Sequence, residues 1–286
     1  MPARSDNQTS LGAARSLADV LDRGADEQDP ALLALLMAAE FFSGLSVQEY
    51  LRRIDALAVR ARDRLGRART PARVISAINA VLFEEEGLAG NVEDYYDPRN
   101  SFLNEVLDLR AGIPITLSVV WLAVARRLRQ PVAGVGLPMH FIVKYISPRA
   151  EIFVDPFSGG QILTREECVA RIGEALGGAT PETAERLLMP VPPRDILYRM
   201  LTNLKFIYLK RKDFANAAKT VDMMLQVRPD EPEEIRDRGL LHFQMEEWAR
   251  AARLLQRYLV ENPAADDFDA IGIRLRQAAN HRARLN

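Results

Sequence analysis

The sequence predicts an α+β fold, with a helical N-terminal part and a central helix packed on a small antiparallel sheet, followed by an α-helical repeat module. Three observations predict it: a helical segment that is apolar on nearly every side, three short β-branched segments after it, and a 34-residue periodicity near the C-terminus. We therefore expect three regions: a flexible N-terminal arm over 1–30, a core domain over 31–189, and helical repeats with a capping helix over 190–286.

Composition and charge exclude several classes of protein. Of the 286 residues, 48% are apolar and 27% are charged, and the net charge is −1. Such a charge gives no general attraction to nucleic acid or to an anionic membrane, so we expect neither as a partner. A single cysteine excludes an intramolecular disulfide, and no apolar leader segment opens the chain, so we expect a cytoplasmic protein. The locally basic segment 60–73 is interpreted as a solvated helix end and loop.

The N-terminal half contains two helices with clear start signals. Within the polar arm, a short helix is possible around Leu17–Leu21. Ser46 and Glu49 form a capping box before a segment whose apolar residues recur every three or four positions. Thr70 followed by Pro71 then predicts an N-cap with proline in the first helical turn.

Periodicity is lost between residues 83 and 101, where the chain is polar and contains Gly87, Gly90 and the pair Tyr95-Tyr96. A long polar loop inside a compact domain is often functional. The alternative is a loop in which Asp and Asn side chains simply satisfy their own backbone. The sequence leaves both interpretations open, and on the first one we assign binding roles to four loop residues: Asn91, Tyr95, Tyr96 and Asn100.

The central helix is predicted to begin at Pro114, a favoured first-turn position for proline, and to continue through Leu128. Because it lacks a polar face, it belongs at the centre of the domain. Three strands follow, and Ser147–Ala150 is their obvious hairpin connection. The predicted strands are Val132–Leu137, His140–Ile146 and Glu151–Val154.

His140 and Asp155 are expected to lie on one face of this sheet. If Ile146 pairs with Glu151, His140 lies diagonally across from Asp155, and a tighter loop that pairs Ile146 with Arg149 puts the two directly opposite. Side chains alternate between faces with a period of two, so both registers keep the pair within reach of a hydrogen bond. The result is a histidine held by a carboxylate.

Several motifs together resemble the bacterial Sir-B-type transglutaminase-like core family with C-terminal tetratricopeptide repeats. The residues that carry the resemblance are Phe83, Gly87, Gly90-Asn91, Tyr95–Ser101, Arg110–Ile115, Pro138–Phe141 and Asp155–Phe157. The resemblance implies a papain/transglutaminase-like core, in which Gly-x-Cys opens the central helix and a His and an Asp follow on adjacent strands. Placed on this chain, those three positions are Pro114, His140 and Asp155. The family usually has Gly before the His, and Met139 in that place is expected to narrow access to the imidazole.

Proline at the nucleophile position removes the reacting atom of such a triad. A thiol at a helix N-terminus is activated by the helix dipole and a nearby histidine, and proline supplies neither a nucleophile nor an N–H. Thr116 and Ser118 could replace it, although helical hydroxyls commonly bond back to a carbonyl. Cys168 is a further candidate, but Thr164 and Glu167 predict a capping box with Cys168 packed beneath it.

For His140, a satisfied interior histidine and a retained acid–base or binding role both remain open. We expect no cofactor and no metal site, because the three histidines, including His242 and His281, form no ligand cluster. His242 falls at a packing position of the repeats and is interpreted as a core residue.

The repeat module is predicted from positions 34 residues apart, which match tetratricopeptide repeats. They are Phe214 and Trp248, Ala217 and Ala251, Ala218 and Ala252, and Pro229 and Pro263. The segment Phe268–Ala283 would supply the polar cap of the stack. Pro190–Tyr198 is interpreted as a proline-containing connector through which the repeats dock onto the first domain.

Two functions of different classes follow from these patterns. The first is a non-catalytic protein, a pseudoenzyme that binds a protein or peptide partner through the repeat module and the core pocket. The second is a hydrolase or acyltransferase that acts on a peptide or amide substrate, using His140 and Asp155 with a non-standard nucleophile. The missing cysteine and the repeats favour the first.

Overall fold

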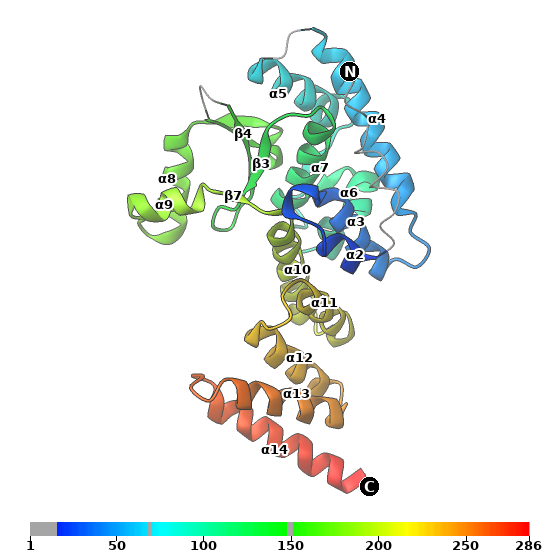
Figure 1. Ribbon diagram of the computed structural model, residues 1–286, viewed down its shortest axis with the longest axis vertical. Coiled ribbons are helices and arrows are strands. Elements are labelled where there is room, and N and C mark those ends of the chain that lie inside the picture. Colours follow the sequence, from blue (N-terminus) through cyan, green and yellow to red (C-terminus); the bar gives the residue numbers. More distant parts are fainter. Residues whose placement is uncertain (1–15, 68–69, 148–150, 286) are drawn as a thin grey trace. The chain divides into compact units, whose positions relative to one another are not determined.

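The computed structural model describes residues 16–67, 70–147 and 151–285 of the chain. It divides into two compact units, Met1–Met200 and Leu201–Asn286 (Figure 1). The helices of the first unit are α2 (Leu17–Leu21), η1 (Ala25–Glu27), α3 (Pro30–Phe41), α4 (Val47–Leu65), α5 (Pro71–Asn79), the π-helical η2 (Ala80–Glu85), η3 (Pro98–Ser101), α6 (Leu103–Leu109), α7 (Pro114–Arg127), η4 (Pro156–Ser158), α8 (Arg165–Leu176) and α9 (Pro181–Leu187). The later helices are α10 (Pro193–Lys210), α11 (Phe214–Val227), α12 (Pro232–Gln244), α13 (Trp248–Glu261) and α14 (Phe268–Leu285).

The main sheet of the first unit is antiparallel throughout, with the strand order β6-β5-β4-β3-β7. Its strands are β3 (Val132–Val135), β4 (Ile142–Ile146), β5 (Glu151–Asp155), β6 (Gln161–Leu163) and β7 (Pro190–Val191). Ile146 pairs with Glu151, which is the first of the two registers expected from the sequence. A separate parallel pair joins β1 (Ala89–Gly90) to β2 (Ala111–Gly112).

Helix α7 occupies the centre of the first unit, as its apolar sequence predicts. Every residue from Pro114 to Ala125 is buried, and Trp121 has no exposed surface. The helix packs against α3 and α4 on one side and against β3 and β4 on the other (Figure 1). The predicted α+β class with a central helix on a small antiparallel sheet is confirmed.

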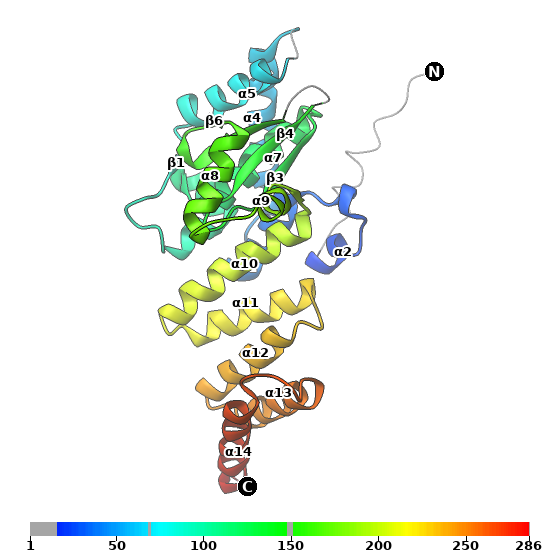
Figure 2. The same cartoon turned by 90° about the vertical axis from the view of Figure 1, so that its left-hand side faces the viewer.

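The face of the sheet on which Ile142 and Phe153 lie packs against α8 and α9. Its core also contains Val135, Leu137, Leu163, Cys168, Ile172, Ala184 and Leu188. Helix α8 lies on the side of the sheet that faces the viewer in Figure 2. The capping box predicted for α8 is present, because Thr164 Oγ1 accepts from the Glu167 N–H and the Glu167 carboxylate accepts from the Thr164 N–H.

The N-terminal part is more ordered than the sequence suggests. The short helix at Leu17–Leu21 forms and lies against α3, with Leu17, Val20 and Leu21 buried. Residues 28–30 are also buried, residues 22–27 are mostly exposed, and residues 1–15 of the expected flexible arm lie outside the described residues. Helix α3 is apolar on all sides and has no amphipathic period, but Asp29 caps its start and Pro30 occupies its first turn, so its start signal was present in the sequence.

Two segments predicted as loop or connector contain regular structure. The stretch 83–101 includes the end of η2, strand β1 and the turn η3, with Asp97 capping η3 by accepting from the Arg99 N–H. The proline-containing segment after residue 189 supplies β7, which pairs with β3, and then the first turns of α10. Because β7 completes the main sheet, the division between the units falls after Met200 and not at residue 190.

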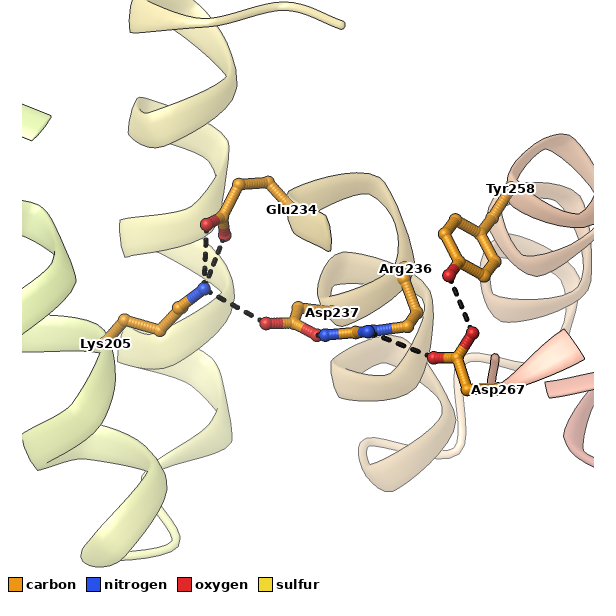
Figure 3. A network of polar contacts seen from close by, with 6 residues as sticks. All are labelled: Lys205, Glu234, Arg236, Asp237, Tyr258 and Asp267. Atoms are coloured by element: carbon orange, nitrogen blue, oxygen red, sulfur yellow. Dashed lines mark hydrogen bonds and ion pairs between the residues drawn. The ribbon is translucent and has the colours of Figure 1, made fainter. Parts of the chain in front are cut away.

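The predicted helix pairs of the repeat module are present in α11 to α14. Gly239 allows close contact, since a Cβ at this position would lie 2.7 Å from the Leu255 side chain. A polar network also crosses this unit: the Lys205 ammonium contacts both Glu234 and Asp237, and the Arg236 guanidinium contacts Asp237 and Asp267 (Figure 3). His242 is buried and hydrogen-bonded to Glu247, which agrees with a packing role.

Candidate functional site

The structure brings His140 and Asp155 together at the end of β5. The His140 imidazole Nε2 lies 2.9 Å from the Asp155 Oδ2, and the Asp155 side chain has no exposed surface. His140 lies two residues before β4 begins, and 21% of its side chain is exposed. The pair is therefore a buried carboxylate that holds a partly exposed imidazole.

Asp155 is held by more partners than the sequence indicates. Its Oδ2 also accepts from the Arg171 guanidinium at 2.9 Å and from the Ser158 hydroxyl at 3.1 Å, while its Oδ1 accepts from the N–H groups of Phe157 and Ser158. Burial alone would raise the pKa of Asp155, but the hydrogen bond and charge of His140, together with Arg171 and Ser158, lower it to about 2. The carboxylate is therefore ionised at neutral pH and fixes the imidazole orientation.

The turn that carries His140 is shaped by Pro138 and Met139. The His140 N–H donates to the Leu137 carbonyl at 3.2 Å, and Met139 has a φ of +56°, which is the pattern of a type II turn with proline at its second position. Met139 is 84% exposed, so most of its surface is in contact with solvent and little of it is left to cover the imidazole. The expectation that Met139 narrows access to His140 is therefore wrong.

Arg199 of α10 fixes the same turn from outside the sheet. Its guanidinium donates to the carbonyls of Leu137 and His140, both at 2.7 Å, and lies 5.5 Å from the centre of the Phe141 ring. Burial lowers the pKa of Arg199. No sequence signal identified this residue, because it lies 59 positions after His140 in the chain.

The start of α7 contains Pro114 where the resemblance places the nucleophile. Pro114 is buried and occupies the first turn of the helix, as predicted. The Thr116 hydroxyl accepts from the Ile113 N–H at 3.1 Å and lies 2.9 Å from the Asn100 carbonyl. The Ser118 hydroxyl donates to the Phe141 carbonyl at 3.2 Å. Both hydroxyls are buried; the Thr116 hydroxyl also lies 3.0 Å from the Ile113 carbonyl, which is the expected back-bond, whereas Ser118 bonds a carbonyl outside its own helix.

Cys168 lies beneath the start of α8 in the apolar core. Its side chain has no exposed surface, and burial raises the pKa of its thiol to about 11. A thiol in this environment remains protonated at neutral pH. Cys168 is therefore a packing residue, in agreement with the interpretation from the capping box.

The loop after β1 reaches the site through aromatic rings. The Tyr95 ring packs edge-on against Tyr96 and against Phe157, and Phe157 in turn packs edge-on against the His140 imidazole. Gly90 is required here, because a Cβ at this position would lie 2.7 Å from the Phe157 ring. Burial raises the pKa of Tyr95.

Asn91 and Asn100 close this loop. The Asn91 amide donates to the Asn100 side chain at 3.0 Å, and the Asn100 amide donates to the carbonyls of Asp94 and Tyr95. These contacts are local, and Asn100 is 3% exposed. Of the four proposed binding residues, Tyr95 is linked to His140 through the Phe157 ring and Tyr96 packs against Tyr95, whereas Asn91 and Asn100 shape the loop.

Neither metal-binding nor membrane-spanning features are expected from the sequence, and the described residues contain neither. Within residues 16–67, 70–147 and 151–285, three or more His, Cys, Asp or Glu side chains do not gather in a metal-binding arrangement. In the same part of the chain, no helix is both long enough and apolar enough to cross a membrane.

Comparisons with known proteins agree with this architecture. Residues 48–202 match the model of the transglutaminase-like superfamily, and residues 204–276 match a tetratricopeptide repeat model. A UPF0162 protein of Xylella fastidiosa (strain 9a5c) is 35% identical over 260 residues, covering 90% of this chain and 92% of the relative. Protein SirB1 of Salmonella typhimurium is 27% identical over 236 residues, covering 81% and 85%.

A mouse protein is similar to part of this chain. F-box only protein 21 of Mus musculus is 29% identical over 187 residues, which cover 62% of this chain and 29% of that protein. The superfamily match covers more than half of the chain, and the Xylella relative extends over nearly all of it. The chain therefore belongs to the transglutaminase-like superfamily, in a SirB-type family that joins a transglutaminase-like core to C-terminal tetratricopeptide repeats.

Proposed function

We propose that this protein is a non-catalytic binding protein that holds a protein or peptide partner through its transglutaminase-like core and its repeats. The observation that carries the proposal is Pro114, buried in the first turn of α7 where a related enzyme would present its cysteine. Proline has no nucleophilic atom and no N–H, so the step that would form a covalent acyl intermediate has no reacting group.

The side chains that could replace the cysteine support the same proposal. Thr116 and Ser118 are buried and bonded to backbone groups, and the thiol of Cys168 is protonated and has no exposed surface. Nucleophilic catalysis requires an exposed atom within hydrogen-bond reach of a base. None of these three side chains offers an exposed atom.

The surroundings of His140 suit recognition of a side chain. The partly exposed imidazole of His140 has a fixed orientation and lies beside the Phe157 ring. The Tyr95 ring packs against the other side chain of this pair, Phe157, and the neighbouring Tyr96 is 46% exposed. Aromatic surfaces with one oriented polar group are typical of binding sites for peptides and small ligands. We therefore propose that Tyr95, Tyr96 and His140 contact the partner, and that Asn91 and Asn100 keep the loop in shape.

The repeats offer a second contact surface. Tetratricopeptide repeats expose helix faces that bind other chains, and in this unit Phe206 and Val260 are 53% and 72% exposed. Large exposed apolar side chains on such a module mark candidate contact positions. We propose a bacterial cytoplasmic setting for this binding, which the single reduced cysteine fits.

The test uses the immobilised full-length protein and a pool of peptides from digested protein, with both retention and mass change of the peptides measured. We expect a subset of peptides to be retained without any change in mass, and retention to fall in His140→Ala or in Phe206→Asp. Leu176→Asp, at a 49% exposed position on α8, is the matched control for adding a charge at an exposed apolar site. A peptide whose mass changes with wild type and not with His140→Ala would refute the non-catalytic function.

One observation favours the second function, in which the chain is a hydrolase or acyltransferase. Asp155 is ionised and holds the imidazole of His140 in one orientation, as a general base requires. In that case water or a substrate group, and not a protein side chain, would be the nucleophile. The mass-change arm of the same experiment separates the two functions.

A further inference from the structure

A cavity of about 190 Å³ lies in the core unit between α4, the segment after η2 and the end of α6. Apolar residues and arginines make up most of its lining, and one lining residue, Glu86, carries a carboxylate. The lining residues are Arg53, Ala56, Leu57, Arg60, Glu86, Leu88, Leu107 and Arg110. His140 and Asp155 do not line it, so the cavity is separate from the site described above.

Two of the three guanidinium groups are already held by carboxylates. Arg53 pairs with Asp108 and also donates to the Leu107 carbonyl at 2.8 Å. Arg60 pairs with both Glu85 and Glu86. These contacts fix the orientation of the two side chains and compensate their charge, so neither provides the main attraction for a ligand.

Arg110 is the uncompensated cation of the cavity. It ends α6 with a φ of +58°, and its backbone is fixed because its carbonyl accepts from the Ala89 N–H at 2.9 Å. Among the described residues its exposed guanidinium has neither a hydrogen bond nor an ion pair. A guanidinium presents planar, paired donors that match the oxygens of a carboxylate or a phosphate.

The apolar walls strengthen such a contact. Leu57, Leu88 and Leu107 are 6%, 5% and 8% exposed, so the cavity is bounded by packed aliphatic side chains. A charged hydrogen bond beside an apolar wall is less weakened by water than one on an open surface. The volume is below the 300–1,000 Å³ or so of pockets that hold drug-sized ligands, which restricts the occupant to a small molecule.

We propose that this cavity binds a small organic anion, whose carboxylate or phosphate group pairs with Arg110 while a short apolar part lies against Leu57 and Leu88. The proposal does not depend on the function of His140 and Asp155. It gives a role to Arg110, which is the first residue of the Arg110–Ile115 motif. In the part of the chain that the structure describes, Arg110 itself makes no hydrogen bond or ion pair with the residues of the His140 site.

The test is calorimetric titration of the full-length protein at low and matched ionic strength, because salt screens exposed charges. The probes are butyrate, inorganic phosphate and uncharged 1-butanol. We expect saturable binding of at least one anion and none of the alcohol. Tighter binding of butyrate would assign the carboxylate as the ligand group, and tighter binding of phosphate would assign the phosphate.

Two variants test the position of the ligand. Arg110→Gln should weaken binding about tenfold, which is about 1.4 kcal/mol, since it removes the charge and the paired donors that would contact the anion. Ala56→Glu should weaken it as well, by placing a carboxylate at the cavity on an exposed helix position that tolerates glutamate. Ala56→Glu lies on α4 and leaves the end of α6 unchanged. If Arg110→Gln fails to fold, Ala56→Glu therefore still tests whether the anion binds in this cavity.

Arg129→Gln is the matched control. Arg129 also has a left-handed backbone, with a φ of +57°, and is exposed, but it does not line the cavity. Its substitution should leave the dissociation constant unchanged. The proposal is overturned if neither anion binds saturably at millimolar concentration, if the alcohol binds as well as butyrate, or if Arg110→Gln and Ala56→Glu bind like wild type.

Discussion

Replacing Asp155 with asparagine tests whether this buried carboxylate is held ionised by its partners. The Asp155→Asn substitution keeps the shape of the side chain and removes the charge that contacts His140 and Arg171. The pKa of Asp155 is lowered from 3.8 to about 2, and each pKa unit corresponds to about 1.4 kcal/mol. The ionised state therefore contributes about 2 kcal/mol to the stability of the core at neutral pH.

The sign of the pH dependence follows from the direction of this shift. Because the folded pKa is below the unfolded one, the contribution is fully present above about pH 4 and is lost as the pH falls toward about 2. The difference in unfolding free energy between wild type and Asp155→Asn should thus be compared between about pH 5 and about pH 3, below the range in which histidine side chains ordinarily change charge. By about pH 3 it should shrink by about 1 kcal/mol, because the unfolded chain then binds the proton more readily than the folded one.

The assay is urea unfolding followed by the fluorescence of Trp121. This residue is buried in α7 and hydrogen-bonded to Asn79, so it reports on the core unit. The chain has two tryptophans, and a Trp248→Phe background removes the one in the repeats. Asp230→Asn, at a carboxylate whose side chain is 94% exposed, is the control for loss of one surface charge. A wild-type to Asp155→Asn difference that stays constant down to about pH 3 would refute the reasoning.

Three further predictions concern single side chains. Met139→Gly should stabilise the core by about 1 kcal/mol in the same urea assay, because glycine adopts a φ of +56° without a Cβ penalty. The control Met189→Gly, at an exposed position without a positive φ, should not stabilise the core. Lys205→Met should destabilise the repeats by about 3 kcal/mol by removing the largely buried cation that contacts Glu234 and Asp237, at the low end of the usual range because Asp237 keeps its contact with Arg236. The loss should be seen as faster hydrogen exchange in α12, while Arg253→Met at an exposed site should leave the exchange unchanged. Cys168 should react with a disulfide reagent only after unfolding, because its thiol is buried and its pKa is about 11; rapid reaction of the native protein would contradict this.

Much of the candidate site could be predicted from local sequence patterns. Strand alternation predicted that His140 and Asp155 would meet, and they do, but the predicted strand start at His140 was wrong, because His140 lies in the turn before β4 (Ile142–Ile146). Pro114 and the capping box at Thr164 could be located because helix starts require particular residues at particular positions. Ser158 was also within reach, since Asp155 followed by proline is the cap signature of η4.

Other parts of the site had no local signal. Arg171 and Arg199 come from helices that follow the hairpin, and only the packing of α8 and α10 brings their guanidinium groups to Asp155 and to the His140 turn. Helix α3 is a different case: it was missed although Asp29 followed by Pro30 is the same kind of start signal as Thr70-Pro71. Strand β7 forms by pairing with β3, and the residues of β7 alone do not indicate this partner.

The sequence by itself determined the α+β class, the central helix beginning at Pro114, the 34-residue repeat and the His140–Asp155 pair. These features depend on periodicity and on residues close together in the chain, which local backbone physics constrains. Only the tertiary structure decided that Asp155 has Arg171 as a further partner, that Arg199 fixes the His140 turn, and that Arg110 faces a cavity without a partner of its own among the described residues. Those contacts join segments distant in sequence, and their geometry is set by how the helices pack against the sheet and against one another.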